Sequence, residues 1–243
     1  MGGKMTKEHK ISVIMMTHES RYSTARELID PWLLQPIDEF IFVDGSGKFP
    51  DNWISPEAKL DRRFNIIRIY KDFGTKTDYA IALLTSGDFV CLADDDVHPL
   101  PGFTEDLLNG YLEGKRITGG RVIVGIIGRT FHGTPYWGNT KFYRSSQVKE
   151  IVRTGFVGCV YFTERAEFGF DIRGCPRNCD DLWWQMKVRH ATPKFVVPTV
   201  KYRNLPCAGD KGAMYKDKDL RAQREKFYKE YYDLYYKPLG RIY

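Results

Sequence analysis

The feature that most constrains the fold of this 243-residue chain is a series of short apolar runs that do not alternate with polar residues. They are ISVIMMT at 11–17, EFIFVDGSG at 39–47, FNIIRIY at 64–70 and FVCL at 89–92. Strands that are apolar on both faces are typical of a parallel sheet covered by helices on both sides. Two stretches with helical spacing lie between these runs, STARELIDPWL and TDYAIALLTSG, and Gly87 is expected to end the second helix. The pattern therefore predicts an α/β domain with a mainly parallel central sheet.

The second half of the chain is less regular. Apolar runs at 121–128, 155–163 and 194–200 predict three further strands. The stretch DDLWWQMKVRH, at 180–190, has acids at its front and cations at its back, which favours a helix that begins there. No internal repeat or low-complexity linker divides the sequence, so we expect one domain.

The last part of the chain is basic and rich in tyrosine. Beyond residue 200 there are eleven Lys or Arg and six Asp or Glu, so this segment carries +5 of the net charge of +6. From residue 217 onward the spacing predicts an amphipathic helix with an aromatic stripe, which we expect to pack on the domain. Cations and aromatic residues together also suit an anionic partner such as nucleic acid, whereas a solvated helix face is the ordinary alternative.

The composition excludes several classes of protein. No apolar run is long enough to cross a bilayer, and the start MGGKMTKEHK lacks the apolar core of a signal peptide, which predicts a cytoplasmic location. The five cysteines show no zinc-site spacing, because Cys175 and Cys179 are not followed by a second pair. We therefore expect reduced structural thiols.

Three consecutive aspartates, Asp94, Asp95 and Asp96, follow the apolar run at 89–92. Charges this close repel one another unless a positive group lies among them. A divalent cation would be such a group, since carboxylate oxygens suit Mg²⁺ or Mn²⁺; a solvated acidic turn is the alternative. In parallel sheets ligands bind beyond the carboxyl ends of the strands. Because Thr17 and Asp44 also end apolar runs, the metal interpretation is favoured.

Four motifs in order resemble those of GT-A fold glycosyltransferases of the family-2-like group, over most of residues 11–200. The motifs are ISVIMMTHESR, FIFVDGSG, SGDFVCLADDDV, and GFDIRG followed by CDDLWW. The resemblance implies a single Rossmann-like, nucleotide-sugar-binding GT-A domain with a C-terminal amphipathic helix. Its parts would be a tail at 1–10, a nucleotide-binding half at 11–100, an acceptor half at 101–216 and the basic helix at 217–243.

The resemblance further implies an inverting, metal-dependent hexosyl- or pentosyltransferase. The donor would be a nucleotide-sugar, in particular a UDP-sugar, and the cofactor Mn²⁺ or Mg²⁺. The acceptor would be a hydroxyl of a glycan, a protein glycan or a hydroxylated base in DNA.

The same resemblance assigns roles to individual residues. Asp94 and Asp96 would bind the metal as an Asp-x-Asp motif. At the helix start, Asp181 would be the general base that deprotonates the acceptor, with Asp180 as its supporting acid; a helix cap is the alternative. The expected donor contacts are Thr17, Arg21, Asp44, Lys76, Asp78, Asp95 and Lys211.

The acceptor side is assigned more loosely. One of Trp183 and Trp184 would stack on a sugar while the other lies in the core. His132 and Trp137, in the loop RTFHGTPYWGN, are further acceptor candidates. Many relatives use a late histidine as another metal ligand, and the chain departs from them because no histidine follows His190.

Two other function classes stay open. A nucleotidyltransferase also places carboxylates and a metal at strand ends, although it should have a glycine-rich phosphate loop after the first strand, and MMTHESRYSTAR has no glycine. A non-enzymatic phosphate- or nucleic-acid-binding module leaves both acidic clusters unexplained, because carboxylates repel phosphate.

Overall fold

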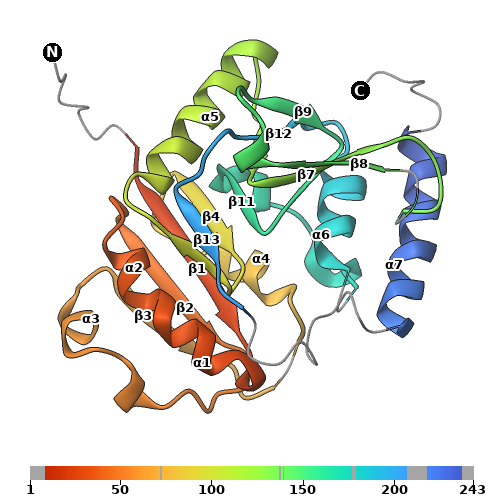
Figure 1. Cartoon of the computed structure of the whole chain (residues 1–243). Helices are drawn as coiled ribbons and strands as arrows, with labels where there is room; N and C mark the ends of the chain where they lie inside the picture. The colour runs from red at the N-terminus through yellow and green to blue at the C-terminus, as the bar shows by residue number, and fades with distance from the viewer. Residues whose placement is uncertain are drawn as a thin grey trace, which may run out of the picture.

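The computed structural model describes residues 9–71, 73–136, 138, 140–176, 179–206 and 218–236. Within these residues eight strands form the central sheet, in the order β3-β2-β1-β4-β11-β6-β12-β9 (Figure 1). Four neighbouring strands of the first half run parallel to one another. They are β1 (Ile11–Thr17), β2 (Glu39–Asp44), β3 (Phe64–Arg68) and β4 (Phe89–Ala93). The predicted α/β class with a mainly parallel central sheet is confirmed.

The other half of the sheet is mixed. β11 (Val160–Glu164) runs antiparallel to β4 and to β6 (Ile123–Gly125). β12 (Lys194–Val196) runs parallel to β6 and antiparallel to β9 (Val152–Thr154). A short ribbon pairs β5 (Val97–Pro99) with β13 (Tyr202–Asn204).

Two of the predicted strands are in fact each two strands. The run 121–128 divides into β6 and β7 (Ile127–Phe131), and the run 155–163 divides into β10 (Phe156–Gly158) and β11. β10 and β7 join β8 (Thr140–Arg144) in a separate three-stranded sheet. At the second break Cys159 has a φ of 61°, in the left-handed region that non-glycine residues rarely adopt. An apolar pattern cannot show such a break, because both pieces are buried.

Helices cover both faces of the central sheet. Alternate strand residues point to opposite faces, so Val13 packs in one core cluster and Ile14 in the other. The first face is covered by α5 (Phe103–Thr118) and by the helical turns between β1 and β2. Those turns are η1 (Glu19–Arg21), α1 (Tyr22–Ala25), η2 (Arg26–Leu28) and α2 (Ile29–Leu33), while η3 (Asp51–Trp53) and α3 (Pro56–Leu60) lead to β3.

The second face is covered by α4 (Thr77–Ala82) and by the helix that begins at Asp180. That helix consists of α6 (Asp180–Leu182) and the π-helical η7 (Trp183–Val188), so its predicted start is confirmed. The prediction that α4 extends to Gly87 is wrong. Gly87 instead lies against β1, where an added Cβ would come within 2.7 Å of the Ser12 backbone nitrogen. Shorter turns on the way are η4 (Ser145–Gln147), η5 (Arg165–Phe168) and η6 (Ile172–Gly174).

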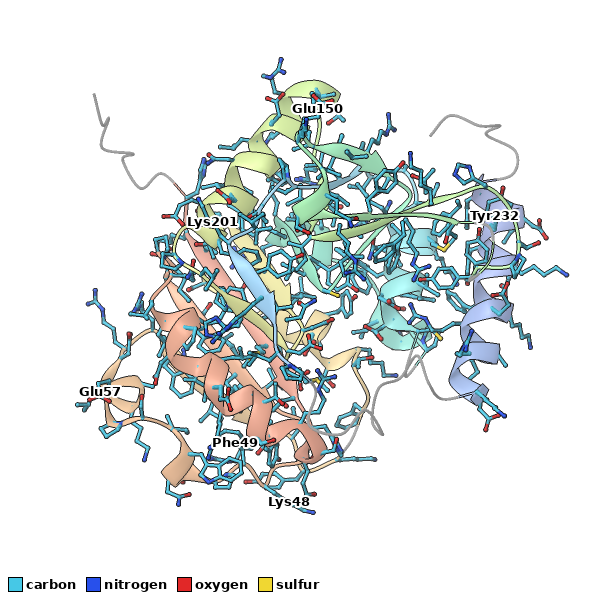
Figure 2. All side chains as sticks on the ribbon, viewed as in Figure 1. Lys48, Phe49, Glu57, Glu150, Lys201 and Tyr232 are labelled. Carbon is cyan, nitrogen blue, oxygen red and sulfur yellow. The ribbon has the colours of Figure 1, made fainter. Side chains whose placement is uncertain are left out.

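The C-terminal helix α7 (Lys218–Tyr231) continues into the π-helical η10 (Tyr232–Tyr236). Figure 2 shows Tyr232 at one side of the molecule and Glu57 of α3 at the other. Tyr228 and Tyr231 are buried against Tyr136, Leu182 and neighbouring residues, in a third core cluster. The expectation that the aromatic stripe packs on the domain is confirmed for these described side chains.

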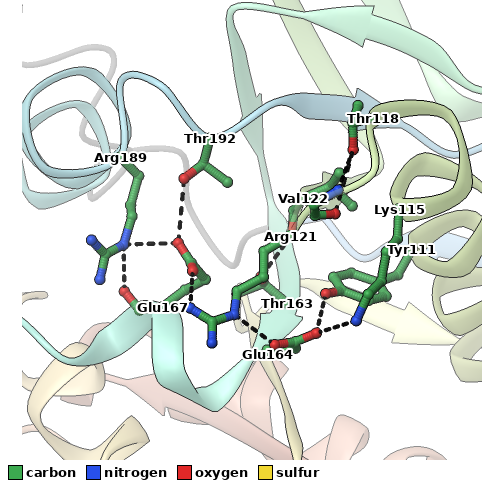
Figure 3. A network of polar contacts seen from close by, with 11 residues as sticks. Tyr111, Lys115, Thr118, Arg121, Val122, Thr163, Glu164, Glu167, Arg189 and Thr192 are labelled. Atoms are coloured by element: carbon green, nitrogen blue, oxygen red, sulfur yellow. Dashed lines mark hydrogen bonds and ion pairs between the residues drawn. The ribbon is translucent and has the colours of Figure 1, made fainter.

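A polar network holds the molecule together at the amino ends of the parallel strands (Figure 3). Glu164 accepts hydrogen bonds from Tyr111, Lys115 and Arg121, and these bonds outweigh burial and lower its pKa to about 2. Glu167 pairs with Arg121 and Arg189. The network links α5, β11 and the end of η7, and it lies away from the residues predicted to be functional. Among the described helices, none is both long enough and apolar enough to span a bilayer.

Candidate functional site

The carboxyl ends of β1, β2 and β4 meet at one edge of the central sheet. Thr17 lies beside Asp44 in the pairing of β1 with β2, and Met15 lies beside Ala93 in the pairing of β1 with β4. Asp94 follows Ala93 directly, so the three predicted strand-end positions do converge. The convergence follows from parallel pairing, which brings equivalent ends of the strands together.

Arg21 is the positive group that lies among the three aspartates. Its Nη2 is 2.8 Å from Oδ1 of Asp95 and 2.9 Å from Oδ2 of Asp96. Thr17 Oγ1 donates a hydrogen bond of 2.7 Å to the other oxygen of Asp95. Burial raises the pKa of Asp95 to about 6, while Arg21 and the Thr17 hydrogen bond oppose that rise. Arg21 and Thr17 therefore position Asp95 and Asp96 directly.

Asp94 forms no ion pair with a described Lys or Arg, and the charge of Arg21 only partly opposes the rise of its pKa. Its backbone N–H donates to the carbonyl of Cys159, the residue with the left-handed backbone, at 2.9 Å. Surrounding protein atoms remove much of its hydration, and with the charges of Asp96 and Asp95 they raise its pKa to about 8. Yet the residue as a whole remains exposed, so a ligand can reach it. Asp94 is thus an accessible carboxyl group in a crowded acidic environment.

Asp44 holds the turn after β2. It is 0% exposed, and its carboxylate accepts hydrogen bonds from the backbone N–H groups of Ser46, Gly47 and Phe49 and from the Tyr22 hydroxyl. Burial, followed by the hydrogen bond to Asp44, raises the pKa of Tyr22 to about 12. These contacts favour turn formation as the role of Asp44, rather than the direct nucleotide contact expected from the resemblance.

The start of α4 brings further charges to the same edge. Oδ1 of Asp78 is inaccessible to water and accepts no hydrogen bond within the described part of the chain. Burial raises the pKa of Asp78 well above its usual value, and the charges of Asp180, Asp94 and Asp95 add to the effect. Lys76 lies nearby and donates to the carbonyl of Cys175 at 3.4 Å.

The acidic pair at the start of α6 faces this cluster, but its two members have different partners. Asp180 is 8% exposed and accepts a hydrogen bond from the Thr75 hydroxyl. Burial and the charge of Asp181 raise its pKa to about 7. Asp181 forms a bidentate ion pair with Arg224 of α7, with N–O distances of 2.8 and 2.7 Å. The side chains of this pair are 12% exposed for Arg224 and 18% for Asp181.

Trp183 and Trp184, two of the predicted acceptor contacts, lie in the core. Trp183 and Trp184 are 4% and 0% exposed and both belong to the second core cluster, so neither offers a free face to a sugar. Trp184 stacks on Phe168 with the ring centroids 5.0 Å apart. The π-helical geometry of η7 places consecutive residues against the core, which ordinary helical spacing does not predict. His132 is exposed after β7, and Trp137 and Lys211 lie outside the described residues.

The chemistry of the acidic cluster fits a hard cation. Asp78, Asp94, Asp95 and Asp180 all have raised pKa values, and no described residue donates a hydrogen bond to the buried Oδ1 of Asp78. Carboxylate oxygens are the ligands that Mg²⁺ and Mn²⁺ prefer. In the described part of the chain, no three Asp, Glu, His or Cys side chains are already arranged around one point as metal ligands. A cation here would therefore need further oxygen ligands from a substrate.

Sequence reasoning missed three residues of the site. Arg224 occupies a position in the aromatic stripe of α7, four residues before Tyr228, and a charged residue in a buried stripe is a signal for an ion pair. Thr75 gives no such signal, since its partner Asp180 is 105 residues away. Tyr161 lies among Asp94, Asp180 and Asp181, and burial followed by these charges raises its pKa.

The fold is of the GT-A-like class. Three similar solved structures are of S. aureus TarS, each with a TM-score of 0.59. TarS 1–349 in complex with UDP-GlcNAc is 17% identical, over 83% of this chain and 60% of that one. Another structure of TarS 1–349 is 13% identical, over 95% of this chain and 74% of that one. A structure of TarS is 14% identical, over 96% of this chain and 46% of that one.

These identities show a shared fold alone. The chain covers less than two thirds of the length of the TarS chain in two of these three structures. No protein-family model matches the sequence, and no curated protein matches it.

Proposed function

We propose that this chain is an inverting glycosyltransferase that moves a sugar from a UDP-sugar or a similar nucleotide-sugar to a hydroxyl acceptor. The observation that carries the proposal is the acidic cluster at the carboxyl edge of a GT-A-like sheet. One of the structures with the same fold holds UDP-GlcNAc, which supports a nucleotide-sugar as the donor. A phosphate-binding module without a metal would not place so many carboxylates at its binding edge.

The donor would lie across the ends of β1 and β4. Asp94 is accessible there, and Arg21 and Thr17 hold Asp95 and Asp96 in place. Asp94 and Asp96 would hold Mn²⁺ or Mg²⁺, which when bound neutralises charge on the diphosphate leaving group. Lys76 lies on the same side and could approach the nucleotide if it released the Cys175 carbonyl.

The acceptor would be activated by the acidic pair. We assign Asp181 as the base, because it is the more accessible of the two carboxylates and Arg224 fixes both of its oxygens. The acceptor hydroxyl would give its proton to Asp181 as its oxygen attacks the anomeric carbon from the face opposite the leaving diphosphate. Asp180, behind it and bonded to Thr75, would support the charge of the pair.

The competing assignment exchanges the two roles. A general base works best with a pKa near the operating pH, and the pKa of Asp180 is about 7. Single-turnover transfer with Asp181→Asn and Asp180→Asn separates the two. We expect a loss of about 10²–10⁴-fold in rate for Asp181→Asn and a milder loss for Asp180→Asn. The opposite order would assign the base to Asp180, and retention of anomeric configuration in the product would exclude the direct displacement.

The donor site is tested by calorimetry with UDP and Mn²⁺. We expect Asp94→Asn and Asp96→Asn to abolish metal-dependent UDP binding while the melting temperature stays near that of the wild type. The matched control is Glu57→Gln, an exposed carboxyl group on α3, at the left of the molecule in Figure 2. Unchanged UDP affinity in both aspartate variants would rule out the metal-assisted donor site.

A further inference from the structure

The hairpin β7–β8 is rich in cations and aromatic residues, like the C-terminal segment. Residues 127–144, which form the hairpin, contain three Lys or Arg and no Asp or Glu, so their net charge is +3. The same residues include five aromatic side chains, Phe131, Tyr136, Trp137, Phe142 and Tyr143. Figure 1 shows this hairpin reaching across to α7, which contributes Arg224 to the candidate site.

Three arginines and two aromatic rings form a continuous row from the candidate base to the surface. The Arg224 guanidinium lies 5.8 Å from the Tyr136 ring centroid, and Arg129 lies 4.9 Å from the same ring. Arg129 is also 5.1 Å from the Phe142 ring, which has Arg144 at 5.6 Å. We call this set, Arg224, Tyr136, Arg129, Phe142 and Arg144, the arginine–aromatic row. Its inner end is the partner of Asp181, and its outer end is exposed.

The outer end of the row is open to a ligand. Phe142 is 39% exposed, and Lys141 and Arg144 are exposed. Across the described residues neither Lys141 nor Arg144 forms an ion pair with a carboxylate; the contacts of Lys141 and Arg144 are with the rings of Tyr143 and Phe142. A guanidinium that is not already paired with an acid can bind a phosphate without first losing a salt bridge.

We propose that the exposed outer end of the arginine–aromatic row, Phe142 and Arg144 with Lys141, binds a single-stranded nucleic acid, and that the buried inner end links this surface to Asp181. The cations match the phosphates, and an exposed aromatic ring between cations matches unpaired bases, which stack on such rings whatever their sequence. An anionic membrane would require a larger exposed apolar surface than one phenylalanine. As a statement about the link to Asp181, the proposal rests on the proposed glycosyltransferase function; as a statement about binding, it does not.

Fluorescence anisotropy with a fluorescein-labelled oligothymidylate and the full chain tests the binding. We expect the Lys141→Gln/Arg144→Gln variant to bind at least about tenfold more weakly, and the slope of log affinity against log salt to fall by about 1.4, or about 0.7 for each lost phosphate contact. Phe142→Leu should weaken binding about tenfold and leave the slope unchanged, because it removes stacking and no charge. The matched control is Lys59→Gln, an exposed cation on α3.

Three results would overturn the proposal. The first is that the wild type does not bind the oligothymidylate. The second is that Lys59→Gln loses as much affinity as the row variants. The third is that inorganic polyphosphate binds equally tightly and Phe142→Leu has no effect. The last result would identify the surface as a site for phosphate polymers without bases. If the double variant does not unfold cooperatively, the measurement is repeated with Lys141→Gln alone. Hydrolysis of UDP-sugars without an acceptor is measured in parallel, because its absence would count against the glycosyltransferase and not against the binding row.

Discussion

The ion pair between Asp181 and Arg224 should couple the C-terminal helix to the candidate site, and Arg224→Met tests this. Both N–O distances are below 3 Å and both side chains are largely buried, at 18% and 12% exposure. Removing one partner of a buried pair costs about 3–5 kcal/mol, since the other charge is left without compensation. Because water reaches part of this pair, we expect a loss near the lower end, about 3 kcal/mol in the free energy of unfolding.

Urea unfolding followed by circular dichroism measures the loss in a double-mutant cycle with Asp181→Asn. The double variant Asp181→Asn/Arg224→Met should recover part of the loss, with a coupling energy of about 1–3 kcal/mol. Lys226→Met, an exposed cation of the same helix, is the control and should change stability by less than about 0.5 kcal/mol. If Arg224→Met resembles this control, or if the two single changes are simply additive, the pair does not hold α7 to the site.

Three further outcomes follow from the structure. Burial raises the pKa of Asp180 to about 7, so transfer that needs ionised Asp180 should become faster as pH rises from 6 to 8. If Asp180→Asn keeps the same rise, the rise does not come from Asp180. Deleting residues 218–243 should lower the melting temperature, because it removes the buried Tyr228 and Tyr231 from the third core cluster. An unchanged melting temperature would show that this helix adds nothing to stability. Burial lowers the pKa of Lys194 to about 7, so the unfolded state holds more protons than the folded state between about pH 7 and 10.5. Stability should then rise with pH across that window by at most about 1.4 kcal/mol per unit, and Lys194→Met should lack this rise in urea titrations.

The sequence by itself determined the four parallel strands of the first half and the edge at which the chemistry is gathered. Unbroken apolar runs such as 11–17 and 89–92 have no polar face to expose, so they belong in a covered sheet, and the structure has β1 and β4 there. Because parallel strands have their carboxyl ends at the same edge of a sheet, Thr17, Asp44 and Asp94 were expected at one edge. The start of the helix at Asp180 was also readable, because acids at the front of a helix and cations at its back are local preferences.

Only the tertiary structure decided which partner each of these side chains meets. Asp44 faces into its own turn, Arg21 binds Asp95 and Asp96, and Asp181 meets an arginine 43 residues further along the chain. The left-handed backbone at Cys159 and the π-helical η7 likewise depend on how neighbouring sheets and helices pack. Patterns along the chain report whether a residue is buried and in what kind of element. The partner of a buried charge is set by distances across the fold, and ion pairs between residues far apart in sequence leave no periodicity to read.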